Sequence, residues 1–198
     1  MTELLLASNN DHKHAEFVRL FPGVRIVRPR EIGVDFAFAE DGASFLDNAL
    51  GKARALQALA HRPTIGDDSG LCVAALGGGP GIRSSRYGSD GTRELPAPAR
   101  NQLLLSRLAG SADRRAFFVC CLVLAIDGER FVAVQETVHG EIAPAPRGAN
   151  GFGYDPLFVD PASGRTFAEL PPEAKDALSH RGRALERLAS RLAWHHGR

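Results

Sequence analysis

Four groups of polar residues have types and spacings that could bind phosphate or a metal ion. The first is Ser8-x-Asn10-x-x-Lys13, which follows an apolar run and precedes a helical pattern. Backbone N–H groups at the start of a helix bind phosphate, and a lysine there adds positive charge. The segment lacks the glycines and the Gly-Lys-Ser/Thr ending of a Walker A loop. A capped turn with a surface lysine is the alternative interpretation.

The second group is Glu40 and Asp41, followed by Asn48 and Lys52. Asn48 and Lys52 are four residues apart, so they share one face of the predicted helix. Lys52 lies beside the apolar stripe of that helix, which places it at the rim of a cleft. A solvated helix edge is the alternative, because exposed lysines are usual on helices.

The third group is Asp67-Asp68-Ser69-Gly70, at the end of a short strand. Two adjacent carboxylates should repel each other, and burying them unpaired is costly. A divalent cation would remove that cost, and Mg²⁺ prefers carboxylate oxygens and keeps water that can attack phosphorus. An Asp-rich turn that caps a helix is the alternative interpretation.

The fourth group combines the loop at residues 150–156 with two later segments. Phe152 and Tyr154 stand between glycines, and a base could stack on such a ring. Lys175 lies on a short predicted helix, and Arg181, in Ser-His-Arg-Gly, can offer a planar fork to a base oxygen or a phosphate. The alternative is an aromatic loop packed in the core, followed by a polar helix start.

Each group alone is a weak to moderate indication, but the combination is more specific. Lysine and arginine suit phosphate groups, carboxylates suit a hard metal ion, and an aromatic loop suits a nucleobase. Together the four groups match a nucleoside triphosphate bound with Mg²⁺.

Short strands and helices in alternation must position these groups. The apolar runs predict strands at 3–7, 24–27, 64–65, 117–126 and 131–139, the last two joined as a hairpin by Asp-Gly-Glu. Helical spacing predicts helices at 12–21, 99–108, 171–178 and 183–194, and one from Ser44 that ends before Pro63. Residues 36–42, 66–70 and 77–81 are expected to be loops or turns. The pattern favours an α/β fold with a mixed sheet and flanking helices.

Composition limits the possible functions. The chain has 198 residues, 44% of them hydrophobic, and a net charge of +1, so no overall basic field attracts nucleic acid or an anionic membrane. Three cysteines, two of them the adjacent Cys120 and Cys121, fit neither a disulfide framework nor a zinc site. No segment reaches the length of a membrane helix, and the first residues are unlike a signal peptide. A cytoplasmic protein is expected.

The motifs occur in the order found in a known family. They are Ser8-x-Asn10-x-x-Lys13, Phe45-x-x-Asn48-Ala49-x-x-Lys52-Ala53, Asp67-Asp68-Ser69-Gly70-Leu71, Gly78-x-Pro80-Gly81-Ile82-x-Ser84-x-Arg86-Tyr87, Gly151-Phe152-Gly153-Tyr154-Asp155-Pro156 and Ser179-His180-Arg181-Gly182. With these motifs the chain resembles the inosine triphosphate pyrophosphatase family, in particular its bacterial XTP/dITP diphosphatase type. The resemblance covers nearly the whole chain.

This resemblance implies an elongated α/β fold in which residues 1–198 form one domain of two lobes, with the active site in the cleft between them. It implies a homodimer that requires Mg²⁺ and binds neither nucleic acid nor membrane. It also implies cleavage of dITP, ITP and XTP between the α and β phosphorus, which yields a monophosphate and pyrophosphate.

The resemblance also assigns roles to single residues. Glu40 and Asp68 bind Mg²⁺, Asp68 accepts the proton of the attacking water, and Asp67 supports the metal or a second water. The residues that hold the triphosphate are Ser8, Asn9, Asn10, Asp11, His12, Lys13 and Lys52. Phe152 stacks on the base, and the other residues assigned to the substrate, around base and phosphates, are Ser69, Gly153, Tyr154, Asp155, Lys175, His180 and Arg181. Asn9 departs from the family, because many members carry glycine at this position.

Three other functions remain as alternatives. The motifs specify phosphates better than the base, so a Mg²⁺-dependent pyrophosphatase for another nucleotide, such as dUTP, is the nearest. Arginines near the C-terminus suggest a nucleic-acid binder, but the net charge of +1 weakens that interpretation. A serine hydrolase using Ser69 or Ser179 lacks the Gly-x-Ser-x-Gly elbow.

Overall fold

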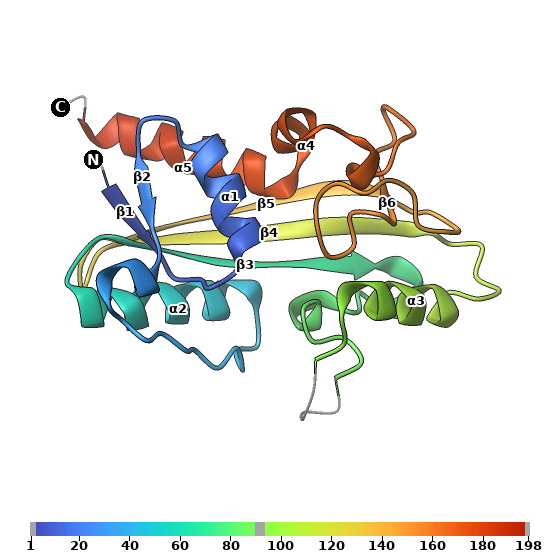
Figure 1. Cartoon of the computed structure of the whole chain (residues 1–198), viewed down its shortest axis with the longest axis horizontal. Helices are drawn as coiled ribbons and strands as arrows, with labels where there is room; N and C mark the ends of the chain where they lie inside the picture. The colour runs from blue at the N-terminus through green and yellow to red at the C-terminus, as the bar shows by residue number, and fades with distance from the viewer. Residues whose placement is uncertain (1–2, 90–93, 197–198) are drawn as a thin grey trace. The chain divides into compact units, whose positions relative to one another are not determined.

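The computed structural model describes residues 3–89 and 94–196. Six strands in this part form one sheet in the order β2-β1-β3-β4-β5-β6 (Figure 1). β1 pairs in parallel with β2 and β3, whereas β5 and β6 are antiparallel, so the predicted mixed α/β class is confirmed. The strands are β1 (Glu3–Leu6), β2 (Arg25–Val27), β3 (Thr64–Val73), β4 (Arg115–Ala125), β5 (Phe131–Ile142) and β6 (Phe158–Val159). The helices are α1 (Asp11–Leu20), α2 (Phe45–Ala60), α3 (Ala97–Arg107), α4 (Pro172–Leu178) and α5 (His180–His196).

The chain divides into two compact units. Unit 1 consists of Met1–Asp68, Cys120–Glu136 and His180–Arg198, and unit 2 consists of Ser69–Val119 and Thr137–Ser179. Strands β3, β4 and β5 contribute residues to both units. Within the described residues, no helix is both long and apolar enough to cross a membrane.

Helices cover both faces of the strands in unit 1 (Figure 1). On one face, Phe17 of α1 and Leu185 of α5 join strand residues in a buried cluster. On the other face, Ala53 of α2 packs in a second cluster. Cys120 belongs to the first cluster and Cys121 to the second, so these neighbours point to opposite faces of β4. Both are free thiols.

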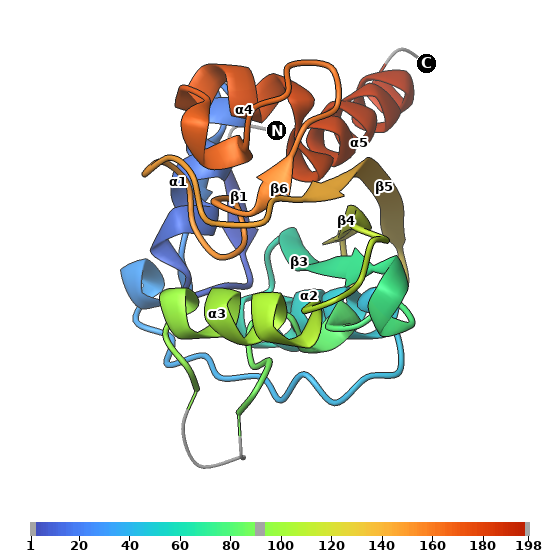
Figure 2. The same ribbon diagram turned by 90° about the vertical axis from the view of Figure 1, so that its right-hand side faces the viewer.

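Unit 2 has its own hydrophobic core. Leu104 and Leu108, in and directly after α3, pack there with Phe118, Tyr154 and Phe158. The rings of Phe118 and Phe158 lie 4.6 Å apart between centroids and are tilted by 50°, a favourable aromatic contact. Figure 2 shows α3 and α4 on opposite sides of the strands of this unit. This core supports the loop at residues 151–156.

Two predicted boundaries are wrong at places that matter for the site. Residues 66–70 do not form a turn, because β3 runs without interruption from Thr64 to Val73. Gly66 serves close packing instead, since a Cβ there would lie 2.0 Å from the carbonyl oxygen of Ala49 on α2. Helix α5 begins at His180 rather than at residue 183, so Arg181 lies in its first turn.

Candidate active site

The turn after β1 leads directly into α1, and its polar side chains fix the backbone. Asn10 is the N-cap, and its Oδ1 accepts a hydrogen bond from the backbone N–H of Lys13 at 3.0 Å. The hydroxyl of Ser8 accepts from the N–H of Asn10 at 3.1 Å. The side-chain amide of Asn9 donates to the carbonyl of Phe36 at 2.8 Å, so this side chain connects the turn to the loop that precedes α2. The predicted helix N-terminus is therefore present and is preceded by a hydrogen-bonded turn.

Asp67 and Asp68 are consecutive residues of β3, so their side chains point to opposite faces of the sheet. Asp67 accepts hydrogen bonds from Lys13 and Arg181, of α1 and α5. Asp68 accepts from two side chains of α2, Asn48 at 3.1 Å and Lys52 at 3.0 Å. The repulsion predicted for adjacent carboxylates is relieved because each has its own cationic partners.

Asp67 is fully buried, and cations contact both of its carboxylate oxygens. Nζ of Lys13 lies 2.6 Å from Oδ1, and Nε of Arg181 lies 2.7 Å from Oδ2. Arg181 is also buried, and its Nη1 donates to Glu16 on α1. Burial alone would raise the pKa of Asp67, but Arg181 and Lys13 hold it well below its ordinary value. Four side chains therefore form a series of ion pairs with alternating charge, in the order Glu16, Arg181, Asp67 and Lys13.

Lys52 contacts two carboxylates at once. Its Nζ lies 2.5 Å from Oε1 of Glu40 and 3.0 Å from Oδ1 of Asp68. Burial alone would lower the pKa of Lys52, but Asp68 and Glu40 hold it above its ordinary value. Burial raises the pKa of Asp68, Glu40 adds to this rise, and Lys52 opposes it. Among these three groups, negative charge exceeds positive charge by one.

Glu40 and Asp68 fit a divalent cation that has few protein ligands. Both place a carboxylate oxygen against the same ammonium group, so their oxygens converge on one region. Mg²⁺ is usually bound by one or two carboxylates, and water and phosphate oxygens complete its shell. In the described residues, no group of three or more His, Cys, Asp and Glu side chains could enclose a metal ion. The arrangement thus suits an open site, completed by substrate.

Unit 2 holds the aromatic loop, residues 151–156. Oδ2 of Asp155 accepts from the backbone N–H of Phe152 at 2.8 Å and from Nζ of Lys175 at 2.5 Å. The same ammonium lies 4.9 Å from the centroid of the Phe152 ring. Tyr154 is buried, and its hydroxyl donates to the carbonyl of Ser84 at 3.0 Å. Phe152 is therefore the partly exposed ring of this loop, whereas Tyr154 belongs to the core.

Other predicted site residues have different surroundings. Asp11 makes exposed ion pairs with Arg28 and Arg30, at 2.6 and 2.7 Å. His12 is exposed on α1, and His180 is buried at the start of α5. Ser69 directly follows Asp68 on β3 and is partly exposed, and the carbonyl of Gly153 accepts from a side chain of α3.

Two buried polar residues next to these groups were not among the predicted site residues. Glu16 stands three residues after Lys13, so both lie on one face of α1, and this spacing was the available signal. Asn101 stands three and seven residues before Leu104 and Leu108, so it interrupts an apolar stripe. A polar residue within such a stripe indicates a specific hydrogen bond.

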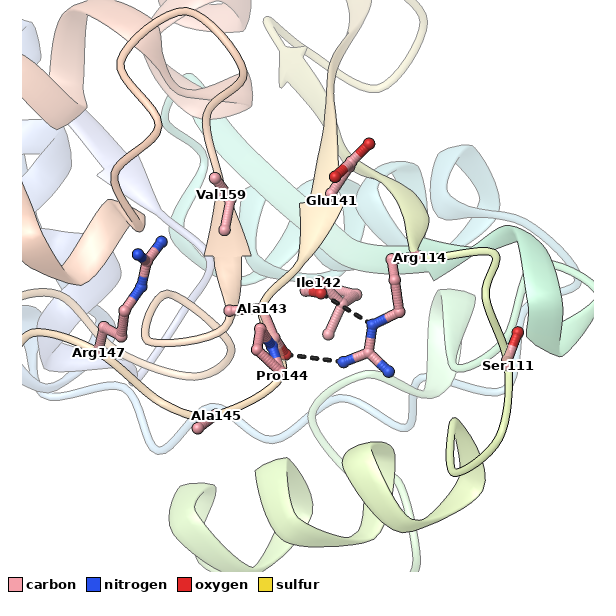
Figure 3. Close-up of a pocket in the computed structure, with 9 residues that line it drawn as sticks. All are labelled: Ser111, Arg114, Glu141, Ile142, Ala143, Pro144, Ala145, Arg147 and Val159. Atoms are coloured by element: carbon pink, nitrogen blue, oxygen red, sulfur yellow. Dashed lines mark hydrogen bonds between the residues drawn. The ribbon is translucent and has the colours of Figure 1, made fainter.

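A separate hollow of about 550 Å³ lies in unit 2, and Figure 3 shows the residues that line it. Its lining includes Arg114, Glu141 and Arg147, and none of the predicted site residues. The guanidinium of Arg114 donates to the carbonyls of Ile142 and Ala143, at 2.9 and 2.8 Å (Figure 3). Arg114 therefore holds the strand end of β5 in place, which is a structural role.

Comparison with known sequences gives matches over nearly the full length. The model of the Ham1 family matches residues 4–191. A dITP/XTP pyrophosphatase of Treponema denticola is 48% identical over 183 residues, covering 92% of this chain and 94% of that protein. A dITP/XTP pyrophosphatase of Aromatoleum aromaticum is 48% identical over 194 residues, covering 96% of each chain.

Solved structures agree with the sequence comparison. A HAM1 protein from Coxiella burnetii has a TM-score of 0.87 at 40% identity, covering 98% of this chain and 99% of that one. A nucleoside-triphosphatase/dITP/XTP pyrophosphatase from Mycobacterium abscessus has a TM-score of 0.74 at 43% identity, covering 94% and 98%. The chain belongs to the Ham1 family.

Proposed function

We propose that this chain is a nucleoside triphosphate pyrophosphatase that hydrolyses dITP, ITP and XTP to the monophosphate and pyrophosphate. Relatives that are named dITP/XTP pyrophosphatases and are 44% to 48% identical support the reaction and the substrate class. The structural observation that carries the proposal is Lys52 in contact with both Glu40 and Asp68. An enzyme of this kind removes deaminated purines from the nucleotide pool.

Unit 1 supplies the groups for the triphosphate. The segment from Ser8 to Lys13 forms the N-terminal end of α1, and helix N-termini favour anions. Lys13 and Lys52 add positive charge, and each already contacts a carboxylate, which fixes its position. Asn9, Asp11 and His12 belong to the same segment and complete this part of the proposal.

Hydrolysis of a phosphoanhydride depends more on position and charge stabilisation than on covalent help from the protein. In the proposed step, a water oxygen forms a bond to the α phosphorus, and the bond from that phosphorus to the bridging oxygen breaks. The electron pair stays on the pyrophosphate, and Asp68 takes the proton of the water. A carboxylate at this position can act as the general base for that water.

The divalent ion in this proposal is Mg²⁺, held by Glu40 and Asp68. When bound, the ion neutralises phosphate charge and lowers the pKa of a coordinated water. Asp67 has cations on both of its oxygens, so we assign it to the support of the metal region through Lys13 rather than to direct coordination. Ser69, directly after Asp68, is proposed to contact the substrate.

The base is assigned to the aromatic loop, together with the residues at the start of α5. Stacking of a base on an aromatic ring contributes about 1–3 kcal/mol, and Phe152 offers a partly exposed ring. Lys175 and Asp155 fix the backbone of this loop, and the carbonyl of Gly153 accepts a further hydrogen bond from α3. Polar donors that bind O6 of a 6-oxopurine would meet the amino group of adenine, and His180 and Arg181 are proposed for this discrimination.

A pyrophosphatase for another nucleotide, such as dUTP, is the second candidate. This candidate is favoured because more of the site residues suit phosphate and metal than suit a base. The resemblance further implies a homodimer that acts in the cytoplasm with residues 1–198 as one functional domain, and we include these in the proposal.

A panel of nucleotides tests the proposal. We expect pyrophosphate release from ITP, dITP and XTP to exceed release from ATP by at least about 100-fold, because unpaired polar groups reject the amino group of adenine. Removal of divalent ions with EDTA is expected to abolish release, and added Mg²⁺ to restore it. Preferred hydrolysis of dUTP would select the second candidate, and equal rates on all nucleotides would reject the base discrimination.

A further inference from the structure

The aromatic loop is fixed on both sides of Phe152 by contacts within unit 2. On the N-terminal side, Oδ2 of Asp155 accepts the N–H of Phe152 at 2.8 Å. On the C-terminal side, the carbonyl of Gly153 accepts a hydrogen bond from Nδ2 of Asn101 at 3.1 Å. Asn101 is 52 residues away in the chain, so this bond joins the loop to a separate helix, α3.

Asn101 occupies a position at which an apolar residue would be expected. It is 5% exposed and lies on the face of α3 that carries Leu104 into the core of unit 2. Its Oδ1 has no hydrogen-bond partner among the described residues, and an unpartnered buried oxygen is destabilising. A leucine would have about the same size and would avoid this cost. The amide therefore contributes something other than core packing.

The bond to Gly153 provides that contribution. Gly153 has φ of +63°, a conformation that few other residues adopt, and it stands between the ring of Phe152 and the buried ring of Tyr154. A donor on the Gly153 carbonyl restrains the peptide between Gly153 and Tyr154, one residue beyond Phe152. Together with the Asp155 bond, it sets the direction in which the Phe152 ring is presented.

We propose that Asn101 is a positioning residue that holds the aromatic loop so that Phe152 can stack on the purine of the substrate. The link to the purine rests on the proposed function, whereas the hold on the loop does not. In this proposal Asn101 acts through the Gly153 backbone and not by direct contact with substrate or metal. Its loss should therefore weaken substrate binding more than it slows the chemical step.

The first test measures the loop itself and needs no substrate. Hydrogen exchange is followed by mass spectrometry on peptides that cover residues 151–157, in the wild type and in Asn101→Leu. We expect at least about tenfold faster exchange in the variant, because a local contact that limits opening is lost. The neighbouring exposed Gln102→Leu is the matched control and should leave exchange unchanged. Unchanged exchange in Asn101→Leu would overturn the proposal, and Asn101→Ala replaces this variant if leucine prevents folding.

The second test asks whether Asn101 acts through Phe152. We expect Asn101→Leu to raise KM for dITP about fivefold, with kcat within about twofold, because part of the stacking energy is lost. In a Phe152→Ala background, the same change should raise KM no further. An equal rise in both backgrounds would contradict action through the ring. No turnover of any nucleotide by the wild type would reject the proposed function, and the exchange result would still decide the role of Asn101.

Discussion

Replacing Asp68 by asparagine is expected to lower kcat for dITP and XTP by about 10³-fold or more. The change removes the proposed proton acceptor, and general base catalysis contributes typically about 10²–10⁴-fold. It also removes one of the two carboxylates assigned to the metal. The fold should persist, because the amide has the same size, and Lys52 keeps Glu40 as a partner at 2.5 Å. Steady-state pyrophosphate release measures the effect.

The control for this prediction is Asp35→Asn, which removes the same charge from an exposed loop position of unit 1. Its rate should stay within about twofold of the wild type, as is usual for surface substitutions away from a site. Thermal unfolding of both variants shows whether the fold is retained. A folded Asp68→Asn protein with a rate close to that of the wild type would contradict the role of Asp68.

Replacing Arg181 by methionine is expected to lower the free energy of unfolding by about 3–5 kcal/mol. Methionine fills similar space, but it leaves Glu16 and Asp67 buried without the guanidinium that contacts both. Loss of one partner of a buried ion pair typically costs about this much, because the other charge stays buried. For a chain of this size, the melting temperature should fall by on the order of 10 °C.

The matched control is Arg187→Met on the same helix. Arg187 pairs with Glu136 at 2.5 Å, but its side chain is 56% exposed, so the change should cost about 1 kcal/mol or less.

The effect at Arg181 should also depend on pH. The folded pKa of Asp67 is depressed. The stabilisation that Asp67 contributes is therefore fully present above its unfolded pKa, and it is lost as the pH falls from there through the folded pKa. The difference in the free energy of unfolding between the wild type and Arg181→Met should therefore become smaller in acid. Both proteins are measured in EDTA.

Helix and strand positions could be predicted largely because local signals decide them. Ser44 caps α2, and its hydroxyl accepts from the N–H of Asp47, three residues on, which is the usual bond of a capping serine. The turn between β4 and β5 follows from Asp127 and Gly128 in the same way. These features depend on residues close together in sequence.

The course of β3 could not be predicted, because it depends on contacts that are distant in sequence. Gly66, Asp67 and Asp68 are turn-forming residue types, and the sequence alone favours a turn. Gly66 instead allows α2 to approach, and cations from α1, α2 and α5 compensate the two carboxylates. With these partners in place, the segment can remain an extended buried strand.

The candidate site shows the same division. The types of Lys13, Lys52 and Asp68 are the basis of the phosphate and metal chemistry expected here, and this stays a prediction. The charged partners could not be predicted, because they are distant in sequence: Lys13 pairs with Asp67, 54 residues away, and Arg181 pairs with Glu16, 165 residues away. Asn101 was missed because a single buried amide has no sequence motif, only an interruption of an apolar stripe.

The identity of the products tests the central claim most directly. XTP is incubated with the wild-type protein and Mg²⁺, and the phosphorus-containing products are separated and quantified. We predict xanthosine monophosphate and pyrophosphate in equal amounts, because water attacks the α phosphorus. Xanthosine diphosphate and orthophosphate would place the attack at the γ phosphorus and would contradict the account.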